Sequence, residues 1–144
     1  GDVAWEDLEG AFRGCFNLQF AKEIDTPNLT QCTNLMEMFM DCAKFNSPLE
    51  HWDVSKVKTM VGMFNGCKAF NQPLEKWNVS DVTDMQFMFF ECTAFNQSLE
   101  GWEINQLPTL GMQCIFYRCP AGKLPFVEKW KEVGYENLDT NDFK

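Results

Sequence analysis

Residues 45–64 read FNSPLEHWDVSKVKTMVGMF, and residues 70–89 read FNQPLEKWNVSDVTDMQFMF. Twelve of these twenty aligned positions are identical. A third copy begins at residue 95 with FNQSLEGWEI and then diverges. A fixed period of 25 residues is typical of a stack of coils, in which each coil covers the apolar face of the next. The repeat therefore predicts the architecture, while it says much less about what the protein binds.

Two hydrophobic periods alternate within each repeat. Trp52 and Val54 flank polar Asp53, as in a half-buried strand. The run from residue 57 to residue 64 then places apolar residues three and four positions apart, which favours one or two helical turns. The residues expected to cap these turns at their N-termini are Ser55, Ser80 and Asn105. The sequence thus predicts an α/β repeat solenoid of short parallel strands and helical turns, with a helical cap at both ends.

A single domain is expected, made of five segments. The boundaries are residues 1–13 for an N-terminal cap helix, 14–38 for a degenerate first coil, 39–107 for the regular repeats, 108–134 for the last coil with a C-terminal cap helix, and 135–144 for a polar tail. The first helix is predicted from Trp5, Leu8 and Phe12, which lie three and four residues apart. Such caps keep the open ends of a repeat stack soluble.

Three residue types recur at fixed repeat positions and form columns along the predicted stack. The members are Cys15, Cys42, Cys67, Cys92 and Cys119; Asn46, Asn71 and Asn96; and Trp52, Trp77 and Trp102. A buried free cysteine acts as a small hydrophobe, and disulfide bonds along the column are the alternative. Each asparagine is expected to point inward and to satisfy backbone groups of neighbouring coils. The tryptophans are expected in the core, and a column of exposed rings that binds sugars is the alternative.

Composition argues against several classes of function. The net charge is −9 and lysines and arginines do not cluster, which argues against nucleic-acid binding. No apolar run reaches the ~18 residues of a membrane span, and a signal peptide is not recognisable. His51 is the only histidine, and neither a phosphate-binding loop nor a nucleophile elbow occurs. We therefore expect no catalysis, no cofactor and no zinc site.

Candidate partner-binding residues occupy the outward positions of the predicted strands. In successive repeats they are Glu50, Glu75 and Glu100, then His51, Lys76 and Gly101, then Asp53, Asn78 and Glu103. Like charges in neighbouring coils repel one another. A repeated acidic column therefore either attracts a basic protein partner or a divalent cation such as Ca²⁺, or is a solvated polar face that was copied with the repeat.

The motif MFxxCxxFNxPLxxW, followed by Asp or Asn and then VSxVxxM, resembles the BspA-like leucine-rich-repeat surface proteins in their 25-residue Phe/Met-rich form. The match covers residues 39–107 closely and residues 12–38 loosely. This resemblance implies a right-handed leucine-rich-repeat-like solenoid. It also implies a cell-surface or secreted location and a role in adhesion or host interaction, and it brings no catalytic residues.

The expected function is a non-catalytic repeat scaffold for protein–protein interaction, in a surface or secreted module. Two alternatives stay open. One is a structural or Ca²⁺-stabilised surface module without a specific partner, and the other is a carbohydrate-binding adhesin. The expected partner is a protein, with no nucleic acid and no membrane span.

Overall fold

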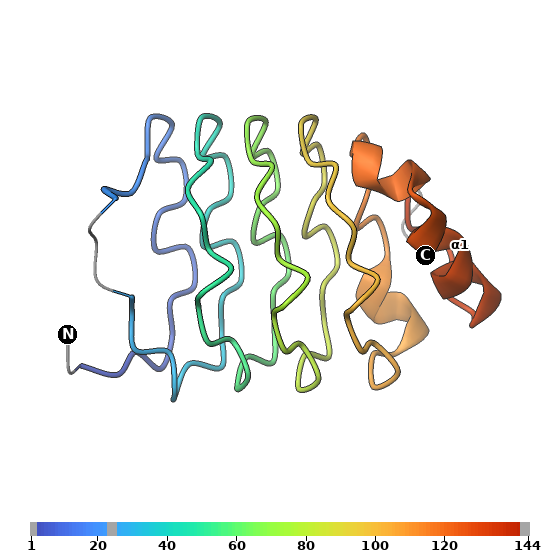
Figure 1. The fold of residues 1–144 in the computed structure, drawn as a ribbon, viewed down its shortest axis with the longest axis horizontal. Helices are drawn as coiled ribbons and strands as arrows, with labels where there is room; N and C mark the ends of the chain where they lie inside the picture. Colours follow the sequence, from blue (N-terminus) through green and yellow to red (C-terminus); the bar gives the residue numbers. More distant parts are fainter. Residues whose placement is uncertain (1–2, 23–25, 142–144) are drawn as a thin grey trace.

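The chain winds through a series of stacked coils, each running beside the next (Figure 1). The computed structural model describes residues 3–22 and 26–141. Its regular elements are two 3-10 helices, η1 (Thr109–Met112) and η2 (Pro120–Lys123), and one α-helix, α1 (Pro125–Glu132). Within the described residues the first four coils contain neither a helix nor a sheet, and η1 and η2 lie in the fifth coil. The predicted α/β solenoid, including its leucine-rich-repeat form, is therefore wrong. We number the coils from the N-terminus, with successive coils beginning at residues 28, 53, 78 and 103.

A run of tight turns replaces the expected helix in each coil. In the second coil, the N–H groups of Leu35 and Glu37 donate to the carbonyls of Thr59 and Val61 in the third coil, at 3.1 and 2.8 Å. The N–H of Met38 instead donates within its own coil, to the Leu35 carbonyl at 3.2 Å. Alternate N–H groups thus bond between coils and within a coil, whereas an α-helix directs each N–H to the carbonyl four residues back.

The helix prediction failed because turn runs and helices share the same side-chain spacing. The buried residues Leu35, Met38, Phe39 and Cys42 follow the i, i+3, i+4, i+7 pattern of an amphipathic helix. The backbone differs, because every fourth residue of the run has a positive φ. In the second, third and fourth coils these residues are Glu37, Asp41, Gly62, Gly66, Phe87 and Glu91. An α-helix contains no left-handed residue, so Ser55, Ser80 and Asn105 cap no helix.

The predicted parallel strands reduce to pairings of single residues. Asp7, Asn34, Thr59 and Asp84 pair in parallel from one coil to the next, and Ala4 pairs with Asn28 in the same way. Each of these pairings is an isolated bridge outside any strand. Burial does alternate through Trp52, Asp53 and Val54 as predicted. However, the N–H of Trp52 closes a turn onto Leu49 at 3.0 Å instead of joining a ladder. Alternating burial therefore indicates an extended segment here without indicating a sheet.

The N-terminal segment is a coil and not the predicted cap helix. The N–H groups of Trp5 and Leu8 donate to the carbonyls of Asn28 and Asn34 in the second coil, both at 3.0 Å. Residues 3–13 thus satisfy the open backbone of the second coil, and a helix would leave that edge unpaired. Trp5 consequently remains 49% exposed. Residues 1 and 2 lie outside the described residues.

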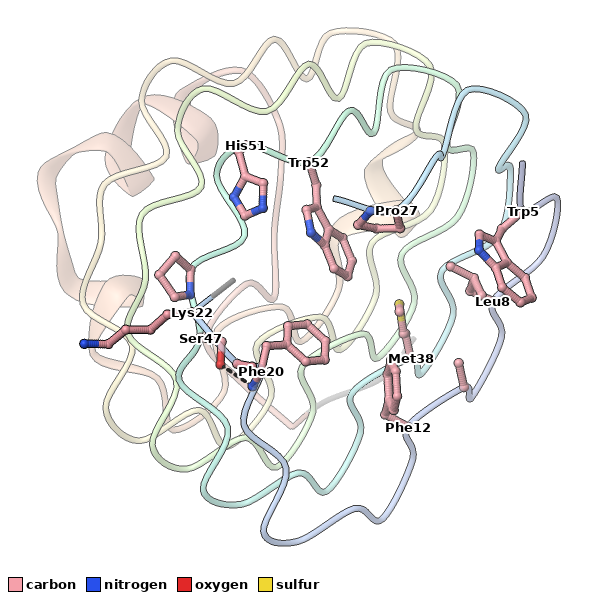
Figure 2. Close-up of a pocket in the computed structure, with 13 residues that line it drawn as sticks. Trp5, Leu8, Phe12, Phe20, Lys22, Pro27, Met38, Ser47, His51 and Trp52 are labelled. Carbon is pink, nitrogen blue, oxygen red and sulfur yellow. Dashed lines mark hydrogen bonds between the residues drawn. The ribbon is translucent and has the colours of Figure 1, made fainter. Parts of the chain in front are cut away.

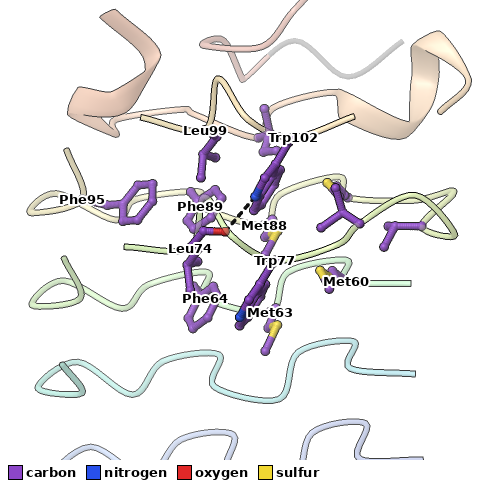
Figure 3. Packing of buried hydrophobic residues seen from close by; sticks show 14 of the residues in the cluster. Met60, Met63, Phe64, Leu74, Trp77, Met88, Phe89, Phe95, Leu99 and Trp102 are labelled. Atoms are coloured by element: carbon purple, nitrogen blue, oxygen red, sulfur yellow. Dashed lines mark hydrogen bonds between the residues drawn. The ribbon is translucent and has the colours of Figure 1, made fainter. Parts of the chain in front are cut away.

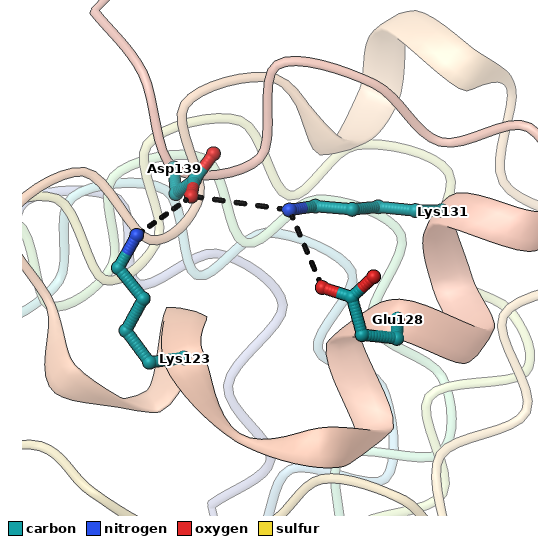
Figure 4. A network of polar contacts seen from close by, with 4 residues as sticks. All are labelled: Lys123, Glu128, Lys131 and Asp139. Carbon is teal, nitrogen blue, oxygen red and sulfur yellow. Dashed lines mark hydrogen bonds and ion pairs between the residues drawn. The ribbon is translucent and has the colours of Figure 1, made fainter.

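The C-terminal end is covered by α1 and by the segment that follows it. The ring of Trp130 in α1 lies 5.8 Å from that of Phe116, stacked at 27°. Tyr135 is buried, and its hydroxyl oxygen lies 2.7 and 2.9 Å from the carbonyl oxygens of Ile104 and Leu107, which share its one O–H donor. Asp139 lies between the ammonium groups of Lys123 and Lys131 in the network of Figure 4. The described part of the expected polar tail, residues 135–141, is therefore packed against the stack, whereas residues 142–144 lie outside the described residues.

The core consists of aromatic columns that run through the stack. Rings at one repeat position stack at 5.7–6.0 Å with interplanar angles of 7–11°. They are Phe12, Phe39, Phe64, Phe89 and Phe116. A second column, Phe45, Phe70 and Phe95, lies beside the first. Figure 3 shows Trp77 and Trp102 packed among these rings. Both tryptophans are buried, as is Trp52, so the core prediction for this column is confirmed and the exposed sugar-binding column is wrong.

The cysteine column is buried except at its first member. Cys42, Cys67, Cys92 and Cys119 are buried and Cys15 is exposed, and the thiols of these five residues are free. Each buried thiol of this column donates to a phenylalanine carbonyl of the preceding coil, for example Cys92 to Phe64 at 2.9 Å. Cysteine therefore supplies both a small apolar volume and a weak donor to a buried carbonyl.

The asparagine column lies at the surface, which corrects the predicted inward orientation. Asn46 and Asn96 are exposed and Asn71 is half-buried. The side-chain oxygens still join neighbouring coils, because the N–H of Asn71 donates to Asn46 Oδ1 at 2.8 Å and the N–H of Asn96 donates to Asn71 Oδ1 at 2.9 Å. The expected backbone satisfaction is thus present, along the outer edge of the stack.

Candidate functional site

The predicted acidic column exists, but lysines interrupt it. Glu50 lies 3.6 Å from the ammonium of Lys76 in the next coil. Glu100 accepts a hydrogen bond from Lys129 of α1, and this contact raises the pKa of the lysine. Glu75 lies beside Gly101. Glu50 and Glu75 therefore each face the residue that follows the glutamate of the next coil, and Glu100 faces a lysine of α1. Lysines thus lie near two of the three carboxylates, which reduces the repulsion expected from the sequence.

Asp53 and Asn78 shape the backbone at the start of their coils. The N–H of Ser55 donates to Asp53 Oδ1 at 3.0 Å, and the N–H of Ser80 donates to Asn78 Oδ1 at 3.1 Å. These are Asx turns, which explain why Asp or Asn precedes Val-Ser in the repeat. The hydrogen bonds from Ser55 lower the pKa of Asp53. Glu103, the equivalent residue in the fifth coil, is exposed, as is His51 in the second.

The acidic columns do not converge on a common point. Across residues 3–22 and 26–141, no three His, Cys, Asp or Glu side chains are placed to hold one metal ion. The strongly perturbed groups are the buried thiols. Burial raises the pKa of Cys42 to about 11 and that of Cys119 to about 12. A raised pKa suppresses the nucleophilic thiolate, so these cysteines have the character of packing groups.

An outward-facing aromatic cluster is the main surface feature that the sequence reasoning missed. The ring of Phe90 lies 5.6 Å from Phe87 and 4.8 Å from Tyr117 in the fifth coil. The Arg118 guanidinium lies 5.2 Å from the centre of the Tyr117 ring and 3.6 Å from a carboxylate oxygen of Glu91. The three rings are half-buried and Arg118 is exposed. The chain thus presents aromatic faces, a cation and a carboxylate together at its surface.

Phe87 places a bulky side chain at a left-handed position of the turn run. Phe87 has φ +60°, at the position that Gly62 occupies in the preceding coil with φ +61°. A bulky residue in the left-handed region costs about 1–2 kcal/mol relative to a residue in an ordinary conformation. The sequence signal for this aromatic cluster lies in the aligned repeats, where Gly62 and Asn65 are replaced by Phe87 and Phe90. A substitution from small or polar to aromatic at an outward position marks a site distinct from the repeat core.

Earlier coils carry further apolar side chains on their turn runs. Met36, Met40 and Val61 are half-buried at outward positions of the second and third coils. We call the set made of Met36, Met40, Val61, Phe87, Phe90, Tyr117 and Arg118 the outer turn face. It crosses four coils and is separate from the predicted acidic columns.

The stacked coils, the aromatic core and this outer turn face define a repeat protein. The chain belongs to the family described as "Mycoplasma protein of unknown function, DUF285", whose model matches residues 6–130. No curated protein and no solved structure matches the chain. In the part of the chain that the structure describes, no helix is long and apolar enough to cross a membrane.

Proposed function

We propose that this protein is a non-catalytic scaffold that binds a protein partner through the outer turn face. The observation that carries the proposal is the cluster of Phe87, Phe90, Tyr117 and Arg118, held at the surface with Phe87 in a strained conformation. Phe, Tyr, Met and Arg are the residue types enriched in the centres of protein interfaces. The turn run requires a left-handed residue at this position in each coil, and a glycine such as Gly62 meets that requirement without the strain that Phe87 carries.

The partner is proposed to carry basic side chains. The chain has a net charge of −9, and Glu91 stands beside the aromatic cluster. Arg118 already demonstrates how a guanidinium lies over Tyr117 while it pairs with Glu91. An arginine from a partner is proposed to stack on the neighbouring rings of the cluster in the same manner, within the field of the acidic chain. Long-range attraction between opposite charges speeds such an association and makes it sensitive to salt.

A surface or secreted location is part of this proposal. It rests on the resemblance of the repeat motif to the BspA-like surface proteins, which are associated with adhesion and host interaction. The exposed acidic columns, with Glu75 and Glu103 as members, are proposed as a secondary contact area for the same basic partner. A structural module without a partner is the competing outcome of the experiment below.

The experiment transplants the residues of the third coil into the fourth. A Phe87→Gly/Phe90→Asn variant carries the natural residues of positions 62 and 65, and glycine relieves the left-handed strain. This variant should fold as stably as the wild type and should lose the proteins that the wild type captures from host-cell extracts, measured by quantitative mass spectrometry. Glu128→Gln, which changes an exposed carboxylate of α1 outside both the outer turn face and the acidic columns, is the matched surface control. Retention of the same captured proteins by the double variant contradicts the outer turn face as the binding site.

Partners lost by the double variant are then tested as purified proteins. Binding is measured by calorimetry at two salt concentrations. The proposal expects an affinity that falls as salt increases, because the partner is basic. A partner whose affinity is independent of salt contradicts the charge argument and leaves only the aromatic contacts.

A further inference from the structure

A pocket of about 320 Å³ lies at the C-terminal end of the stack, where η1 meets the segment that follows α1. The residues that line it are Thr109, Leu110, Gln113, Gly134, Glu136 and Asn137. A larger pocket in the first coil has mainly apolar walls, and its buried polar residue is paired, because Ser47 Oγ accepts from the N–H of Phe20 at 2.9 Å (Figure 2). The C-terminal pocket differs, because it contains a buried polar atom without a partner.

This atom is the side-chain oxygen of Gln113. The residue is 4% exposed, and among the residues that the structure describes its Oε1 alone is a buried side-chain oxygen or nitrogen without a hydrogen-bond partner. The backbone of Gln113 is paired, because its N–H donates to the Leu110 carbonyl at 3.4 Å and its carbonyl accepts from the N–H of Phe87 at 3.2 Å. A buried acceptor without a donor is unfavourable, so Gln113 Oε1 requires a donor from outside the chain.

The repeat explains how this glutamine lost its partner. Gln86 in the fourth coil is equivalent to Gln113, and Asp84 is equivalent to Gly111, since all four carbonyls accept from N–H groups of the preceding coil. Nε2 of Gln86 lies 3.0 and 3.1 Å from the two carboxylate oxygens of Asp84, which hold its amide in place. At Gly111 a Cβ would lie 2.8 Å from the Thr83 carbonyl oxygen, so no side chain fits. The fifth coil therefore keeps the glutamine and lacks the carboxylate.

The lining of the pocket favours a cationic ligand with an alkyl stem. Glu136 is exposed and carries a carboxylate, in a chain with a net charge of −9. Leu110 is 55% exposed and offers an apolar surface beside it. A guanidinium donates to two acceptors at once and is less strongly hydrated than an ammonium, so it loses less when it approaches a buried amide. These features together match the side chain of arginine.

We propose that this pocket binds the side chain of an arginine supplied by a partner protein. The guanidinium donates to Gln113 Oε1 and pairs with Glu136, while its methylene groups contact Leu110. The terminal torsion of a glutamine side chain is broad, and rotation about it turns the unpaired oxygen toward the ligand. The pocket borders the outer turn face, because Gln113 is the backbone partner of Phe87. The source of the arginine rests on the proposed function, whereas the affinity of the pocket for a guanidinium does not.

The test compares two small probes, N-acetyl-arginine methylamide and the corresponding citrulline derivative. The two have the same shape, and only the arginine is charged. Binding is followed by nuclear magnetic resonance through the side-chain amide signals of Gln113, which are assigned by their absence in Gln113→Leu. The arginine probe should shift these signals to saturation and should bind about tenfold more tightly than the citrulline probe. Small, equal shifts that do not saturate would mean that water alone reaches Gln113, and would overturn the proposal.

Two leucine variants separate binding from folding, with the backbone N–H signal of Asn137 as the readout. Gln113→Leu removes the unpaired acceptor, so it should preserve or raise the melting temperature while it abolishes binding of the arginine probe. Gln86→Leu makes the same change in the fourth coil, where the amide is paired with Asp84, so it should lower the melting temperature and leave binding unchanged. Glu136→Gln should reduce the preference for arginine over citrulline. Undiminished arginine binding to a folded Gln113→Leu variant overturns the assignment.

The arginine site and the proposed function can fail separately. If the Phe87→Gly/Phe90→Asn variant keeps its captured proteins while the arginine probe still binds at Gln113, the proposed function fails and the arginine site stands. If the double variant loses those proteins and the probe does not bind, the outer turn face stands and the arginine site fails. When both hold, Gln113→Leu should weaken the binding of the purified partner, and replacement of one partner arginine by lysine should weaken binding to the wild type and not to Gln113→Leu.

Discussion

The two ends of the stack differ in how the open face of the terminal coil is covered. At the C-terminal end, α1 covers the last coil, and Trp130 continues the aromatic column that passes through Phe116. At the N-terminal end, the first coil keeps the backbone path of the repeat but leaves Trp5 and Phe16 about half exposed, at 49% and 55%. Both segments carry apolar residues at helical spacing, yet only one of them is a helix.

The difference shows that the hydrogen-bonding edge of the neighbouring coil decides the structure of each end. The N–H groups of Leu8 and Phe12 donate to carbonyls of the second coil, so residues 3–13 take the coil conformation. At the other end, Pro125 starts α1, and no proline has an N–H to donate to a ladder. The helix then buries its apolar side, Phe126, Val127 and Trp130, on the last coil.

The largest effect is expected from removing an aromatic ring at the covered end. Trp130→Ala should lower the free energy of unfolding by about 3–5 kcal/mol, because Trp130 is 5% exposed and contacts Phe116 and Phe126. Trp5→Ala at the open end should cost about 1 kcal/mol or less, because half of the side chain is already in water. Urea denaturation of the two variants measures both values. Equal losses would show that the two ends are equally packed.

A smaller difference is expected between two left-handed glycines. Gly66 in the third coil has φ +77°, and a Cβ there would lie 2.5 Å from Asp41 Oδ1. Gly14 in the first coil has φ +74°, with nothing within 4 Å of its Cβ position. Both alanine variants lose the conformational freedom of glycine, at about 1 kcal/mol, and Gly66→Ala should lose about 1 kcal/mol more through the contact. Thermal unfolding compares them, and identical melting temperatures would mean that Asp41 rotates away.

The smallest effect is expected from labelling the thiols of the wild-type protein. Modification of the first thiol to react should leave the stability of the protein unchanged. Cys15 is exposed at the open end, whereas Cys119 is buried at the covered end and burial raises its pKa to about 12. At pH 8 a thiol with that pKa is almost wholly protonated, and only the thiolate reacts. Cys15 should therefore react first with a disulfide reagent, and Cys119 only after unfolding. Peptide mapping identifies the site, and early labelling of Cys119 would show that α1 opens readily.

Sequence reasoning located the core positions and missed the conformation between them. The columns of Phe, Trp and buried Cys, with Trp77 and Cys92 as examples, are where the repeat placed them. The strand and the helical turn were wrong, because side-chain spacing reports which residues are inside and not where their N–H groups bond. The predicted acidic residues do occupy exposed or half-exposed positions. Asp53 and Asn78 also accept hydrogen bonds that stabilise turns, a role that periodicity alone did not reveal.

The sequence by itself determined the period, the inward columns and the acidic surface, since these follow from residue type and spacing within one repeat. The tertiary structure decided three further features. These are the left-handed residues of each turn run, the coil conformation of residues 3–13, and the half-exposed rings of Phe87 and Phe90. All three depend on bonds and contacts between residues about one coil apart. An N–H group donates to a carbonyl of the neighbouring coil, and not to a carbonyl of its own helical turn, only when that coil is present. Local sequence does not specify which carbonyl accepts.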